Sequence, residues 1–123
     1  MERMLQPTHI RSMEMTKSSY IVVFITTSSY EEARKIASAL VDQRKAACVN
    51  IVPKVSSLFR WKGKIEDVEE SLMVVKTRAE LFPDVVSTVK SIHSYDVPEI
   101  IALPIVEGNP DYLSWLKEET GGR

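Results

Sequence analysis

Few side chains in this sequence could bind a transition metal through nitrogen or sulfur. The chain contains two histidines and one cysteine. His93 directly follows a stretch with helical periodicity, and a neutral imidazole is a good ligand for copper or zinc. Cys48 lies in an apolar run, where a thiol is either a soft-metal ligand or a small buried hydrophobic group. We therefore take His93 and Cys48 as candidate metal ligands, with a capped helix end and a core position as the alternatives.

Four other side chains are candidates for lining a ligand cleft. Tyr95 and Glu99 follow His93 in a proline-containing turn, whereas Trp61 and Lys76 belong to a long predicted hairpin. If the turn folds back over the next strand, His93 and Glu99 could converge with Trp61 or Lys76 from a neighbouring subunit. Aromatic side chains at a hairpin end are also common interface packing. The sequence predicts the cleft where the hairpin meets this turn.

Patterns typical of catalysis or of nucleic-acid binding are missing. No serine or cysteine has an identifiable base, and the four glycines do not form a phosphate-binding cradle. The formal net charge of -1 leaves no concentrated basic surface for nucleic acid or an anionic membrane. The acidic run at residues 66–70 is interpreted as a solvated strand edge, with a cation-attracting patch as the alternative. We expect a protein that is not an enzyme and has neither nucleic acid nor a membrane as partner.

The sequence predicts a long β-hairpin over residues 46–77, which carries three of the candidate side chains. β-branched and aromatic residues are dense on both sides of Gly63, which marks the turn. Each arm has room for about a dozen residues, roughly 40 Å at about 3.3 Å per residue. Pro53 interrupts the first arm, which predicts a bulge or an edge position there. Because an isolated two-stranded ribbon is only marginally stable in water, we expect a second copy of the chain to support it.

The remaining segments complete an α+β fold. The order is βαββαβ with a short C-terminal helix, which is the ferredoxin-like arrangement with a long hairpin between its second and third strands. The apolar run 20–26 predicts a strand buried on both faces. Two helices would cover one face of a four-stranded antiparallel sheet, and the other face would expose apolar residues that favour an oligomer. We expect one domain at 20–119, a flexible tail at 1–19 and a frayed C-terminus at 120–123.

The predicted location is the cytoplasm. A single cysteine cannot form an intrachain disulfide, so nothing in the sequence indicates an oxidising compartment. Residues 1–19 are polar and charged and lack the apolar core of a secretory signal.

Five segments of the chain resemble the CutA family of divalent-cation tolerance proteins. The resemblance spans residue 20 to about residue 119, and the segments that carry it are 46–50, 57–64, 75–77, 93–100, and 103–105 with 108–115. It implies a ferredoxin-like fold assembled as a tight homotrimer, in which the long hairpins pair between subunits. It also implies a role in divalent metal tolerance without catalytic activity.

The resemblance also bears on the candidate metal, a divalent ion such as copper. Family members associated with copper carry a cysteine on the first strand and two histidines before the tyrosine. The matching positions here are Ile25, Ile92 and His93, so one of the three ligands is present. We therefore expect a non-enzymatic homotrimer linked to metal tolerance. The alternatives are a regulatory trimer like the PII signalling proteins, which would bind a small molecule between its subunits, and a structural or assembly partner protein.

Overall fold

The computed structural model describes residues 19–121, which form a four-stranded antiparallel sheet with three helices. The sheet order is β2-β3-β1-β4, so the predicted α+β, ferredoxin-like fold is confirmed. Residues 1–18 of the predicted tail and residues 122–123 lie outside the described part. In chain order the elements are β1 (Tyr20–Thr27), α2 (Tyr30–Asp42), β2 (Cys48–Trp61), β3 (Lys64–Arg78), the 3-10 turn η1 (Ala79–Leu81), α3 (Phe82–Ile92), β4 (Ile100–Pro104) and α4 (Pro110–Glu119).

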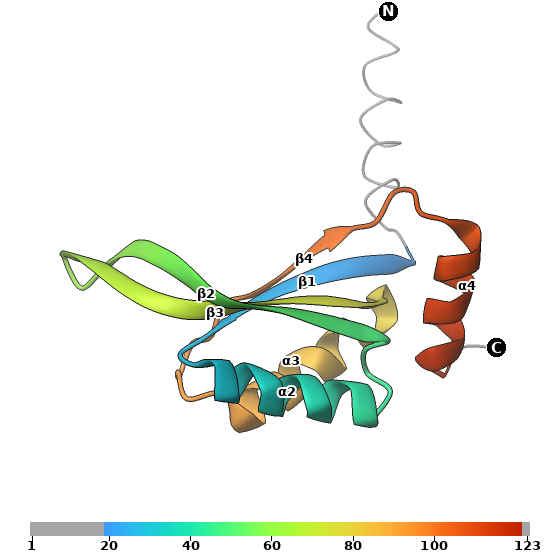
Figure 1. Ribbon diagram of the computed structural model, residues 1–123, viewed down its shortest axis with the longest axis horizontal. Helices are drawn as coiled ribbons and strands as arrows, with labels where there is room; N and C mark the ends of the chain where they lie inside the picture. Colours follow the sequence, from blue (N-terminus) through green and yellow to red (C-terminus); the bar gives the residue numbers. More distant parts are fainter. Residues whose placement is uncertain (1–18, 122–123) are drawn as a thin grey trace, which may run out of the picture.

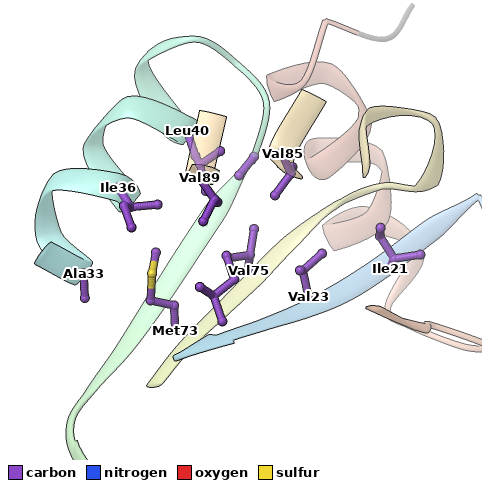
Figure 2. Packing of buried hydrophobic residues seen from close by; sticks show 11 residues of the cluster. Ile21, Val23, Ala33, Ile36, Leu40, Met73, Val75, Val85 and Val89 are labelled. Atoms are coloured by element: carbon purple, nitrogen blue, oxygen red, sulfur yellow. The ribbon is translucent and has the colours of Figure 1, made fainter. Parts of the chain in front are cut away.

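Helices α2 and α3 cover one face of the sheet and form the core with it (Figure 1). Strand β1 alternates between buried and half-buried residues, so it is not buried on both faces as its continuous apolar sequence predicts. The reason is that both helices pack on the same side. Within residues 19–121, no helix has the length and apolar character needed to cross a membrane. Figure 2 shows the packed side chains of this core, among them Val23, Ile36, Leu40, Met73, Val75, Val85 and Val89.

No described helix covers the opposite face of the sheet (Figure 1). Apolar side chains of β1 and β4 lie on this face. Strand register places Leu103 beside Val22 and Ile101 beside Phe24. Ile101 is 52% exposed and Leu103 is 50% exposed, although both lie in a strand. We call this surface, together with Val74 on β3, the open face.

The long hairpin forms as predicted. Strands β2 and β3 have 14 and 15 residues, and they extend well beyond the helices (Figure 1). Lys62 and Gly63 join them with positive φ angles of 51° and 82°, as a type I′ turn requires. The register shifts between Val52 and Val55, around Pro53, because proline cannot donate to the strand ladder. The Ser71 hydroxyl donates to the Pro53 carbonyl oxygen at 2.7 Å and fixes this bulge.

The C-terminal helix α4 packs beyond the end of the sheet, with Leu116 fully buried. The Arg78 guanidinium donates to the Thr120 hydroxyl and carbonyl oxygens, both at 2.8 Å. Arg44 donates to the carbonyl oxygen of Glu119 at 3.2 Å. Cations at a helix C-terminus satisfy its free carbonyl groups and oppose its dipole. Thr120, where the segment predicted to fray begins, is 4% exposed, and the fraying itself stays a prediction.

Candidate functional site

The hairpin meets the turn after α3 at a single hydrogen-bonded pair. The Tyr95 hydroxyl donates to a carboxylate oxygen of Glu70 at 2.8 Å. Glu70 is 7% exposed, so its interpretation as part of a solvated acidic edge is wrong. It directly precedes Ser71, which pairs with Thr27 at the end of β1. Glu70 is thus the first residue of β3 that lies beyond the end of β1. The turn after α3 contacts β3 at this position.

Burial and negative charge keep the Tyr95 hydroxyl protonated. Burial, the hydrogen bond to Glu70 and the charges of Glu70 and Glu32 raise the pKa of Tyr95 to about 12. The phenol is therefore a hydrogen-bond donor throughout the physiological pH range. Together the hydroxyl and the carboxylate present oxygen atoms, which suit hard divalent cations and polar small molecules.

His93 ends α3 and uses both ring nitrogens within the chain. Nε2 lies 2.8 Å from the Thr26 carbonyl oxygen, and Nδ1 accepts from the Tyr95 backbone N–H at 3.0 Å. The side chain is 8% exposed, and its ring centroid lies 4.8 Å from that of Tyr95. A metal ion could bind this imidazole only after one of the two hydrogen bonds broke. The role of His93 as a metal ligand stays a prediction.

Cys48 lies near the far end of the hairpin from its tip, opposite Lys76. Its thiol is 3.9 Å from the Asn50 side-chain oxygen, to which the Lys76 ammonium group also donates. Burial, followed by the neighbouring Cys48, raises the pKa of Tyr112. Within residues 19–121, no group of three or more His, Cys, Asp or Glu side chains is arranged to hold a metal. The role of Cys48 as a ligand also stays a prediction.

The four predicted cleft residues do not converge within one subunit. Tyr95 is at the meeting point with Glu70, and the exposed Glu99 lies four residues further along the same turn. Lys76 is six residues from Glu70 on β3, about 20 Å at about 3.3 Å per residue. Trp61 is a similar distance away in the other direction, because it pairs with Lys64 at the hairpin tip. Trp61 and Lys76 can approach Tyr95 only from another copy of the chain.

The sequence alone does not indicate that Glu70 and Glu32 belong to this region. Glu70 ends a run of acidic residues and looks like its solvated neighbours, because its burial depends on a turn 25 residues later in the sequence. Glu32 forms part of a sequence pattern typical of a helix start, Ser29-x-x-Glu32, and the Ser29 hydroxyl accepts from the Glu32 backbone N–H at 3.1 Å. Its carboxylate, however, contacts Ser94 in the turn after α3. No local pattern could indicate that contact.

Comparison with known proteins identifies relatives of this fold and sequence. The model of the family described as CutA1 divalent ion tolerance protein matches residues 21–119. The divalent-cation tolerance protein CutA of Thermus thermophilus is 55% identical over 100 residues, which cover 81% of this chain and 97% of that protein. A solved structure of the Thermus thermophilus protein has a TM-score of 0.81 at 54% identity, with 83% of this chain and 99% of that chain covered.

Two further relatives are named for compartments other than the cytoplasm. The chloroplastic protein CutA of Arabidopsis thaliana is 44% identical over 112 residues, which cover 90% of this chain and 62% of that protein. The solved periplasmic divalent cation tolerance protein CutA of Archaeoglobus fulgidus has a TM-score of 0.80 at 44% identity, with 82% of this chain and 98% of that chain covered. The prediction of a cytoplasmic location is therefore wrong, because a single unpaired cysteine and a polar N-terminus do not fix the compartment.

Proposed function

The chain belongs to the CutA1 family of divalent ion tolerance proteins, and from this we propose that it is a non-enzymatic homotrimer that acts in the response to divalent metal ions such as copper. The observation that carries the proposal is the Tyr95–Glu70 pair at the root of the hairpin. The pair offers the carboxylate oxygens of Glu70 as ligands, and a divalent cation needs more. A neighbouring subunit would have to complete the site.

The open face and the hairpin support assembly. Half-exposed Ile101 and Leu103 bring apolar surface to the open face, and burying such side chains is the main favourable contribution to association. The hairpin beyond Val55 pairs with no other described strand, so both of its edges are free to contact a second copy. In such an assembly the hairpin of one subunit would bring Trp61 or Lys76 toward the Tyr95–Glu70 pair of the next.

Light scattering tests the assembly. We expect three copies of 13.9 kDa, a mass of about 42 kDa. Ile101→Glu would place a charge in the proposed contact and should reduce the mass. Val41→Glu is the matched control, because Val41 is also exposed but lies on α2, on the other side of the sheet. A wild-type mass of one subunit, or equal masses for both variants, would contradict the proposed contact.

A thermal-shift screen tests the kind of ligand. A compound that binds the folded protein and not the unfolded chain raises the melting temperature. Divalent metals, nucleotides and organic acids would be compared for the wild type and Glu70→Gln. We expect a shift with copper or zinc that Glu70→Gln removes. A shift with an organic acid or nucleotide alone would favour the regulatory small-molecule trimer, and a stable trimer without any shift would favour a structural role.

A further inference from the structure

Glu32 connects two segments that are far apart in the sequence. It lies in the first turn of α2, where a glutamate three residues after the capping serine usually accepts from the N–H of that serine. Here one carboxylate oxygen accepts from the backbone N–H and the hydroxyl of Ser28, both at 3.0 Å. The other accepts from the backbone N–H of Ser94 at 2.6 Å. The carboxylate therefore ties the start of α2 to the turn after α3.

His93 ties the same turn to the end of β1. Its Nε2 is bonded to the Thr26 carbonyl oxygen, two residues before Ser28. Its Nδ1 accepts from the Tyr95 N–H, the residue whose hydroxyl reaches Glu70. The Ser28 and Ser94 hydroxyl groups lie 3.2 Å apart and add a third link. Three consecutive residues are thus each held by a hydrogen bond to a different element. His93 is bonded to the end of β1, Ser94 to the start of α2 and Tyr95 to β3.

We propose that Glu32 is a positioning residue that acts together with His93. Its carboxylate fixes the turn at residues 93–95 and so holds the Tyr95 hydroxyl on Glu70. The positioning of this turn follows from the contacts alone, whereas its importance for ligand binding rests on the proposed function. Glu32 touches neither member of the Tyr95–Glu70 pair through a hydrogen bond, so it acts through the backbone of Ser94.

The chemistry of the acceptors explains why this position needs a carboxylate. Three donor groups face the two oxygens of Glu32, and a carboxylate can accept from all of them. Burial opposes its ionisation, but the hydrogen bonds from Ser28 and Ser94 outweigh burial and lower the pKa of Glu32. A glutamine has one oxygen, so its amide N–H₂ group would face a donor at either Ser28 or Ser94.

The bonds of His93 also specify its tautomer. Because a backbone N–H donates to Nδ1, that nitrogen must carry the lone pair. Nε2 must then carry the proton and donate it to the Thr26 carbonyl oxygen. The neutral Nε2–H form is the only one that makes both hydrogen bonds.

Hydrogen exchange measured by NMR on the metal-free protein tests the positioning. Glu32→Gln should speed exchange of the Ser94 and Tyr95 amides by about tenfold or more, as expected for loss of a bond to a charged acceptor. Amides of the core strands, such as that of Val75, should keep their rates. Glu31→Gln is the matched control, because Glu31 lies next to Glu32 in the same helical turn and is exposed. Equal exchange at residues 94 and 95 in both variants would overturn the proposal.

A second measurement needs no variant. Side-chain ¹⁵N shifts of wild-type His93 at neutral pH should show a protonated Nε2 and an unprotonated Nδ1. A protonated Nδ1, or a doubly protonated ring, would overturn the two-point attachment even if Glu32→Gln did not fold. Both measurements are made without metal. A failure of the positioning is therefore distinct from a failure of the trimer or of metal binding, which light scattering and the ligand screen report separately.

Discussion

Removing the Tyr95 hydroxyl should destabilise the protein by a predictable amount. Tyr95→Phe leaves the ring in place but deprives the 7%-exposed Glu70 carboxylate of its donor at 2.8 Å. Hydrogen bonds to charged groups contribute about 1.5–3 kcal/mol, and water can partly replace this one because Tyr95 is 39% exposed. We therefore expect a loss of about 1–2 kcal/mol in the free energy of unfolding. In a domain of about 100 residues, each kcal/mol lowers the melting temperature by about 4–8 °C.

The assay is denaturant and thermal unfolding at one fixed protein concentration, since an oligomer's stability depends on concentration. Tyr30→Phe is the matched control. Tyr30 is 40% exposed, and its hydroxyl only accepts from the exposed Arg34 at 3.2 Å. That variant should change the free energy of unfolding by no more than about 0.5 kcal/mol. If Tyr95→Phe cost no more than Tyr30→Phe, the Tyr95–Glu70 bond would not be the contact that the structure indicates.

Three further perturbations test other parts of the structure. The pKa of Tyr95 is raised from 10.0 to about 12, so its contribution to stability is complete below pH 10 and is lost as the pH rises to about 12. In unfolding curves measured across this range, the difference in the free energy of unfolding between the wild type and Tyr95→Phe should therefore shrink. Arg78→Ala removes two hydrogen bonds to Thr120 from a side chain that is 14% exposed. The variant should lower the free energy of unfolding by about 2–4 kcal/mol. Because α4 would lose its attachment to β3, amide exchange should become faster in that helix alone. The added methyl group of Gly63→Ala would meet no atom within 4 Å, but residue 63 has a φ of +82°, which strains an alanine. The denaturant midpoint should therefore fall by the equivalent of about 1 kcal/mol. An unchanged midpoint would mean that an alanine is not strained in this turn.

The hairpin shows how much of the fold local chemistry specifies. Gly63 permits the positive φ of the turn, and Pro53 cannot donate to a ladder, so both the turn and the bulge follow from residue type alone. The βαββαβ order likewise follows from the succession of apolar runs and capping residues. The apolar run of β1 by itself predicts burial on both faces, whereas the βαββαβ order places both helices on one side and so agrees with the half-exposed face of this strand.

The candidate site was harder to predict, because its contacts join distant residues. His93 and Tyr95 were recognisable as candidates from their types and from the turn that contains them. Their partners were not, since Glu70 and Glu32 lie 25 and 62 residues from Tyr95 and Ser94, respectively. The sequence predicts Trp61 and Lys76 near Tyr95, whereas strand geometry separates them within one subunit. Their convergence stays a prediction about the assembled protein.

The proposed function depends most directly on whether Glu70 helps to bind a divalent ion. The decisive measurement is a calorimetric titration of copper(II) into the wild type, Glu70→Gln and Glu69→Gln, where Glu69 is the exposed neighbour that pairs with Lys54 at 3.3 Å. We predict that Glu70→Gln loses one binding event per subunit relative to the wild type, whereas Glu69→Gln retains it. Identical binding by all three proteins, or no binding by a correctly assembled wild type, would contradict a metal site at the Tyr95–Glu70 pair.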